Sequence, residues 1–121
     1  MYLIPTDQVP NQEFKVILDS QNCTIHIYQR VDLFLGEACM YLDVYVDSDL
    51  IRQGQKMIPK EPILTEPHSM AGNFYIVDTY ASDDCQKLPD YEGLGERWKL
   101  YWLDDDELAE LGEYRDEEAG V

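Results

Sequence analysis

The sequence predicts an all-β protein, a small antiparallel β-sandwich or partly open barrel of about six strands with a short C-terminal helix. Three observations predict this fold. Apolar and polar residues alternate over much of the chain, and a period of two is typical of strands with one buried face. Short polar clusters separate the alternating segments. The 121 residues, 45% of them hydrophobic, suffice for one core, and the nine tyrosines and two tryptophans suit strands.

The first two predicted strands form a hairpin. Residues 12–18 alternate apolar and charged side chains and place Val16 and Leu18 on one face. Residues 23–30 alternate in the same way, and the connection over residues 19–22 is Asp-Ser-Gln-Asn. Two alternating segments joined by a short polar connection predict a β-hairpin.

The next pair of strands begins with the most regular alternation in the chain. Residues 40–47 place Met40, Leu42, Val44 and Val46 on one face and Tyr41, Asp43, Tyr45 and Asp47 on the other. The chain turns at residues 47–49 and returns over residues 50–58, where Gly54 weakens the strand or marks a bulge. The preceding segment, residues 31–39, is apolar in patches and fits either a strand edge or a folded loop.

Two further strands follow, each after an irregular segment. Residues 59–72 contain three prolines and predict a loop with a short extended piece at residues 63–64, and residues 73–79 alternate as a strand. Residues 81–95 are polar and predict an excursion from the sheet. Residues 97–103 predict the last strand, with both tryptophans on one face.

The C-terminal segment differs in composition, so we expect an all-β domain over residues 1–103 and an acidic helix and tail over residues 104–121. Asp104 has the character of a helix N-cap, with Glu107 three residues later as in a capping box. Gly112 is expected to end the short helix. Residues 104–121 contain nine acidic residues and one basic residue.

The overall charge constrains the partners. The chain has 25 acidic and 9 basic residues, a net charge of −16, which repels nucleic acid and anionic membranes and favours basic protein partners. Three cysteines without CxxC spacing argue against a disulfide framework and favour a reducing cytoplasm. We expect no membrane span and no signal peptide.

Candidate catalytic and metal-binding residues are few, and none has a partner at a recognisable spacing. His26 and His68 have no second ligand at a metal-binding spacing. Cys23 and Cys39 are expected near the core, and Cys85 has acidic neighbours that would raise its pKa. Nucleotide-binding and hydrolase motifs are absent from the sequence. We therefore expect a protein that is not an enzyme and that uses no cofactor or metal.

Four segments together resemble a known family. They are residues 10–19 (PNQEFKVILD), residues 41–45 (YLDVY) with Gly54 in the return, residues 73–79 (NFYIVDT), and residues 90–97 (DYEGLGER) followed by residues 100–103 (LYWL). In this order and spacing they are similar to the baseplate plug family of contractile-tailed phages, known from a cyanophage. The resemblance covers roughly residues 5 to 108 and implies a virion protein, made in the host cytoplasm, at the distal end of the tail tube near the hub and spike. It carries no catalytic residues.

The leading hypothesis is therefore a structural component of a phage tail baseplate that closes the distal end of the tube. The expected partners are other baseplate, tail-tube and hub proteins, with a homo-oligomer or ring in the virion, and neither nucleic acid nor membrane. The expected contact residues are Tyr41, Tyr45, Tyr75, Tyr101, Asp104, Asp105 and Asp106. Two alternatives stay open: an acidic phage-encoded inhibitor that mimics DNA, and a small β-barrel enzyme or ligand binder.

Overall fold

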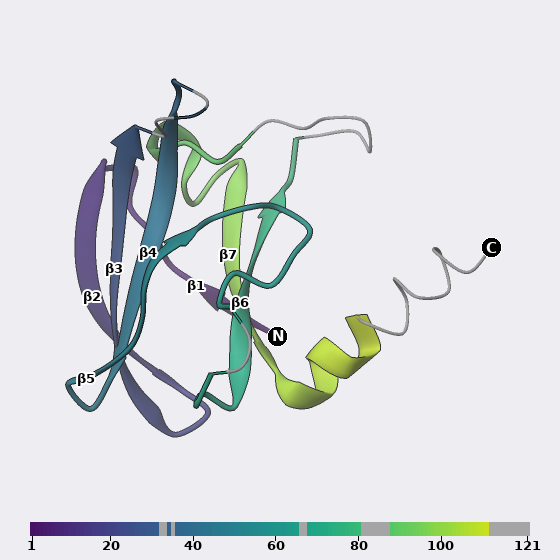
Figure 1. The fold of residues 1–121 in the computed structure, drawn as a ribbon. Coiled ribbons are helices and arrows are strands. Elements are labelled where there is room, and N and C mark those ends of the chain that lie inside the picture. The colour runs from purple at the N-terminus through teal and green to yellow at the C-terminus, as the bar shows by residue number, and fades with distance from the viewer. Residues whose placement is uncertain (32–33, 35, 66–67, 81–87, 112–121) are drawn as a thin grey trace.

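Two antiparallel sheets pack face to face in the computed structural model, which describes residues 1–31, 34, 36–65, 68–80 and 88–111. The four-stranded sheet has the order β2 (Asn11–Leu18), β3 (Gln21–Val31), β4 (Ala38–Val46) and β5 (Asp49–Lys56). The three-stranded sheet has the order β1 (Tyr2–Ile4), β7 (Trp98–Asp104) and β6 (Gly72–Asp78). Figure 1 shows the two layers side by side. The predicted all-β fold is confirmed, as a sandwich.

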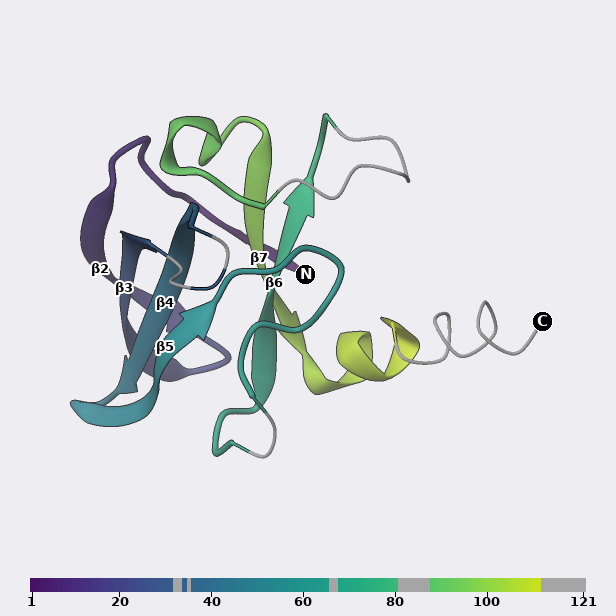
Figure 2. The same cartoon turned by 45° about the horizontal axis from the view of Figure 1, so that its top comes forward.

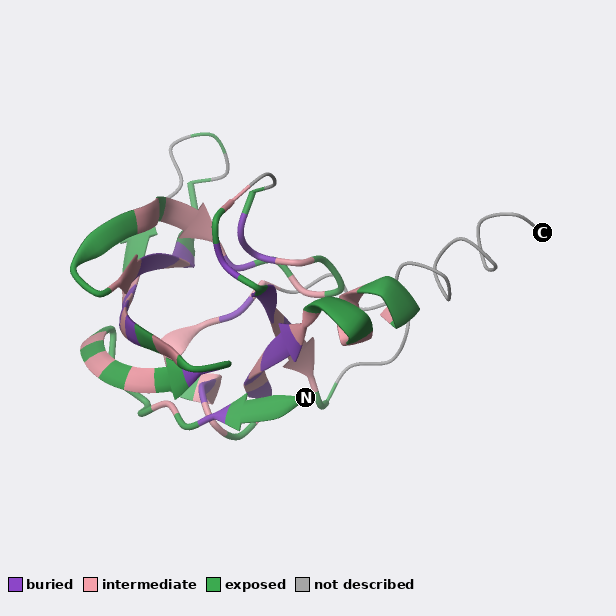
Figure 3. Ribbon diagram, turned by 90° about the horizontal axis from the view of Figure 1, so that it is seen from below, coloured by how far each residue is buried: buried purple, intermediate pink, exposed green. Residues whose placement is uncertain are grey.

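The core lies between the sheets and is built from the faces that the alternation predicted. The four-stranded sheet contributes Ile25, Ile27, Leu42 and Val44, and the three-stranded sheet contributes Phe74, Ile76, Trp98, Leu100 and Trp102, all buried. The alternation of exposed and half-buried residues along β2 is visible in Figure 3. Phe74 and Trp102 pack edge to face, with ring centroids 5.0 Å apart.

Two hairpins of the four-stranded sheet turn through Asp-Ser pairs. Asp19 and Ser20 have φ values of 50° and 64°, and Asp47 and Ser48 have φ values of 49° and 74°. Positive φ at both central residues defines the turn whose twist matches that of the paired strands, and Asp tolerates this conformation. The first connection is shorter than predicted, because residues 21 and 22 already pair with β2.

Gly54 marks a bulge, one of the two outcomes that its position predicted. The pairing of β4 with β5 shifts between Leu42 and Val44, opposite Gly54, which has a φ of 68°. A positive φ at this point favours glycine because it lacks a Cβ.

The irregular segment after β5 closes one side of the sandwich. The Ile63 amide donates to the Phe74 carbonyl at 2.9 Å, so the predicted extended piece at residues 63–64 lies along β6. Asn73, fully buried, exchanges two hydrogen bonds with the backbone of Leu64, at 2.8 and 3.0 Å. On another side, the Trp102 indole donates to Asp19 Oδ2 at 2.6 Å, which joins β7 to the β2–β3 turn.

The structure adds two elements that the sequence reasoning missed. The three-residue strand β1 pairs with β7, which gives seven strands in the described residues instead of six. A 3-10 helix, Tyr91–Gly93, lies within the segment expected to be a polar excursion. A helix covers residues 105–111, as expected, and lies on the far side of the three-stranded sheet from the four-stranded sheet in Figures 1 and 2. The expected helix end at Gly112, the acidic tail beyond it and Cys85 lie outside the described residues.

Candidate interaction surfaces

The outward side of the four-stranded sheet carries a group of aromatic side chains, which we call the aromatic face: His26 and Tyr28 on β3, and Tyr41 and Tyr45 on β4. The antiparallel register places Tyr28 directly opposite Tyr41 and His26 opposite Asp43. The Tyr28 and Tyr41 rings stack with centroids 6.0 Å apart, and the His26 ring lies 4.7 Å from that of Tyr28. Cross-strand aromatic pairs of this kind stabilise a sheet and leave polar ring edges for a partner.

A buried carboxylate organises the aromatic face. Asp43 lies on the outward side of β4, yet it is 6% exposed. Its Oδ1 accepts hydrogen bonds from the Tyr28 hydroxyl at 2.8 Å and from the Gly54 amide at 2.7 Å. Its Oδ2 lies 3.7 Å from Nδ1 of His26. The carboxylate therefore links Tyr28 on β3 to the bulge at Gly54 on β5.

The same carboxylate affects the titration of Tyr28. Desolvation raises the pKa of Tyr28, and the hydrogen bond and negative charge of Asp43 raise this pKa further, against a smaller opposing effect of Arg30. The remaining ring nitrogen of His26, Nε2, lies 2.8 Å from the Asn11 side-chain oxygen on β2. His26 is partly exposed, as expected for its strand position, and is held from both sides.

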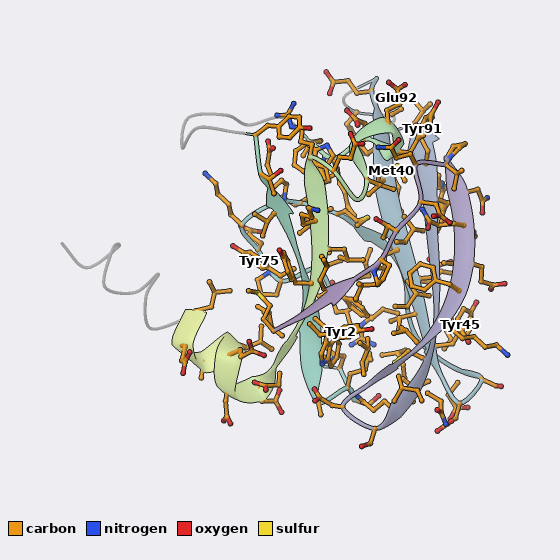
Figure 4. All side chains as sticks on the ribbon, turned by 180° about the vertical axis from the view of Figure 1, so that it is seen from behind. Tyr2, Met40, Tyr45, Tyr75, Tyr91 and Glu92 are labelled. Atoms are coloured by element: carbon orange, nitrogen blue, oxygen red, sulfur yellow. The ribbon has the colours of Figure 1, made fainter. Side chains whose placement is uncertain are left out.

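A second surface lies on the outward side of the three-stranded sheet. Tyr101 on β7 pairs with Tyr75 on one side and with Leu3 of β1 on the other, so the three side chains form a row across the sheet. Both tyrosines are half-buried, and Leu3 is 45% exposed. Figure 4 shows Tyr45 and Tyr75 on opposite sides of the sandwich.

The three acidic contact candidates lie where β7 continues into the helix. The Glu107 amide donates to Asp104 Oδ1 at 2.8 Å, and Glu107 Oε1 accepts from the Asp104 amide at 3.3 Å, which is the predicted capping box. Asp105 and Asp106 are exposed in the first turn. Carboxylates at this end of a helix interact favourably with its dipole, so their placement has a structural reason as well.

The seven candidate contact residues therefore do not form one patch. Tyr41 and Tyr45 lie on the aromatic face, Tyr75 and Tyr101 on the opposite sheet, and the aspartates at the start of the helix. The sequence reasoning missed the part that Asp43 plays. Alternation places Asp43 on the outward side, but the strand register is needed to show that His26, Tyr28 and Gly54 surround it.

The other candidate catalytic and metal-binding residues are buried or hydrogen-bonded within the fold. Burial raises the pKa of the Cys23 thiol, which disfavours the reactive thiolate. Cys39 is also buried, and His68 accepts from the Met70 amide at 3.2 Å. Among the described residues, no three His, Cys, Asp or Glu side chains are grouped so that they could hold a metal ion. The same part of the chain contains no helix that is long and apolar enough to cross a membrane.

Comparison with known protein families finds a match that covers most of the chain. A family model described as "Cyanophage baseplate Pam3 plug gp18" matches residues 1–106, which span both sheets and the first residues of the helix. The search of curated proteins finds no match.

Proposed function

Because this chain belongs to the cyanophage baseplate plug family and is thus a structural component of a phage baseplate, we propose that it closes the distal end of the tail tube, near the hub and spike, through protein contacts. The observation that carries the proposal is the family match over residues 1–106, which confirms the resemblance seen in the four sequence segments. A plug must hold its place by contacts with surrounding subunits, so its function depends on its surfaces.

Two features of the fold support a role in binding proteins. Half-buried tyrosines lie on the outward sides of both sheets, and tyrosine is enriched at the centres of protein interfaces. The aromatic face is also preorganised, because the Tyr28 hydroxyl is fixed by the buried Asp43 carboxylate. A rigid aromatic side chain loses little conformational entropy when a partner covers it.

We further propose that residues 1–103 form the plug domain and residues 104–121 an acidic extension, that the protein is not an enzyme, and that it is made in the host cytoplasm and assembled with tail-tube and hub proteins. The DNA-mimic alternative receives less support. Such an inhibitor would present carboxylates along a whole surface, whereas Lys15 and Arg30 are exposed on the four-stranded sheet.

Deleting the gene from the phage tests this function. We expect particles without a complete baseplate by electron microscopy, and mass spectrometry of wild-type particles should find the protein in a fixed, small copy number. Two complementing variants separate the loss of surface contacts from a loss of folding. The test variant combines Tyr41→Ser with Tyr45→Ser, and the control combines Gln8→Ser with Gln53→Ser at exposed positions. If the deletion phage still makes normal baseplates in particles that lack the protein, the proposal is refuted.

A further inference from the structure

The first strand of the four-stranded sheet, β2, has a free edge, and Figure 1 shows it at the border of the sandwich. Leu18 pairs with Gln21 across the two-residue turn, and the Gln29 amide donates to the Pro10 carbonyl at 2.9 Å. The backbone groups of the even-numbered residues of β2 therefore face β3, and those of the odd-numbered residues point away from the sheet. Within the described ranges, no strand and no backbone hydrogen bond meets this outer edge, which consists of Asn11, Glu13, Lys15 and Ile17.

The other sheet edges are covered or short. Beside β5, the Arg52 side chain donates to the Thr65 carbonyl at 3.3 Å, and the Gln55 side chain accepts from the Thr65 amide at 2.7 Å. Beside β6, the Ile63 amide donates to the Phe74 carbonyl at 2.9 Å, and β1 has three residues. An uncovered edge of eight residues is a template for another strand, and soluble proteins usually protect such edges. The open edge of β2 therefore indicates a binding site for a strand.

The side chains of β2 define the chemistry of the strand that fits beside it. Phe14 and Val16 lie on the inward side, are partly buried and pack against the core. A strand added at this edge extends the core past them when its own inward residues are apolar, which means at every second position. On the outward side the charges of Glu13 and Lys15 cancel, so the edge is neutral in a chain with a net charge of −16.

We propose that the edge of β2 binds an extended segment of a different baseplate protein, which adds a fifth strand to the four-stranded sheet and places apolar residues beside Phe14 and Val16. In such strand addition the backbone hydrogen bonds supply affinity, and alternate side chains supply specificity. A second copy of this chain fits the edge less well, because two molecules of charge −16 repel each other. The inference rests on the proposed baseplate function, which supplies the neighbouring proteins.

A proline at an outward position of β2 tests the proposal in the phage particle. Lys15→Pro removes an N–H that points away from β3, so the pairing of β2 with β3 should be kept, as it is for prolines on edge strands generally. Lys15→Thr is the matched control, because it removes the same side chain and keeps the N–H. Each full-length variant complements the gene deletion, and mass spectrometry measures its copy number in purified particles. Circular dichroism of the purified variants checks folding.

We expect Lys15→Pro to be incorporated at least about tenfold less than the unmodified protein, because the added strand loses a hydrogen-bond donor and meets the proline ring. Lys15→Thr should be incorporated normally. In the unmodified protein, amide hydrogen exchange at Glu13, Lys15 and Ile17 should be at least about tenfold slower in particles than in the free protein. A photo-reactive amino acid at position 17, where the side chain is 68% exposed, should cross-link to a segment of another baseplate protein with apolar residues at alternate positions.

Normal incorporation of a folded Lys15→Pro variant, equal exchange at the three amides in particles and in the free protein, or cross-links only to a second copy of this chain would overturn the proposal. The exchange measurement uses the unmodified protein, so it decides the matter even if the proline variant does not fold. Each of these results would leave intact the proposed baseplate function, whereas particles that never contain the unmodified protein would overturn both.

Discussion

The Asp43 carboxylate should stabilise the fold by several kilocalories per mole, and the free energy of unfolding of the Asp43→Ala variant measures this contribution. Asp43→Ala removes the acceptor of two hydrogen bonds, from the Tyr28 hydroxyl at 2.8 Å and from the Gly54 amide at 2.7 Å. A hydrogen bond to a charged group contributes about 1.5–3 kcal/mol. The variant also regains the free energy spent on burying a charge, so we expect a net loss of about 3 kcal/mol in the free energy of unfolding.

A double-mutant cycle isolates the bond to the tyrosine. Tyr28→Phe keeps the ring and removes the hydroxyl that donates to the carboxylate, so we expect it to cost about 1.5–3 kcal/mol. In the Asp43→Ala background the same change removes only the weaker contact of the hydroxyl with Arg30 and should cost less. The coupling between the two sites should therefore be about 1–2 kcal/mol.

Urea unfolding followed by tryptophan fluorescence is a suitable assay. Trp98 and Trp102 are 0% and 3% exposed, so unfolding transfers both indoles to water. Circular dichroism at the same urea concentrations checks that the transition is two-state. If Asp43→Ala costs less than about 0.5 kcal/mol, the usual size of a surface substitution, or if the two changes are additive, the carboxylate does not organise this face.

Four further predictions follow from single contacts. Trp102→Phe removes the 2.6 Å hydrogen bond to Asp19 and part of a buried ring, and it should lower the free energy of unfolding in urea by about 2–4 kcal/mol. Asp19→Asn should cost less, because asparagine tolerates the positive φ at position 19. Equal costs for the two variants would contradict this. Gly72→Ala would place its Cβ 2.5 Å from Cζ2 of Trp102 and should cost about 1–3 kcal/mol or more, and a neutral effect on the melting temperature would contradict the packing. Asp104→Ala removes the helix cap and should destabilise the helix by about 1 kcal/mol, seen as faster amide exchange in the first turn; unchanged exchange would argue against the cap. The pKa of Tyr28 is raised in the folded state, so the contribution of Tyr28 to stability is complete below about pH 10 and is lost as the pH rises through the folded pKa. In urea unfolding across this alkaline range, the Tyr28→Phe variant should therefore lose less stability than the unmodified protein. An identical pH profile for the two proteins would contradict the raised pKa.

Much of the fold could be predicted from alternation, because a strand with one buried face must repeat every two residues. The strand that escaped prediction, β1, has three residues, too few to show a period, and its Tyr2 and Leu3 are largely exposed. Its position is set by pairing with β7, which lies about a hundred residues away along the chain. A local sequence pattern does not predict such a long-range pairing.

The interaction surfaces were predictable in part. The sequence placed Tyr41 and Tyr45 on one outward face, and the structure places them there. The sequence could not show that Asp43 is buried, because its burial depends on which residues of β3 and β5 lie beside it. The register and the Gly54 bulge decide this, and both are tertiary features.

A cryo-electron microscopy map of the phage baseplate tests the central claim most directly, because it shows both the position of the protein and what covers its surfaces. The account predicts density for the seven-stranded sandwich at the distal end of the tail tube, with the aromatic face and the Tyr75–Tyr101 row buried against neighbouring subunits. A baseplate whose tube end is filled by other proteins, or a sandwich with both tyrosine surfaces open to solvent, would contradict it.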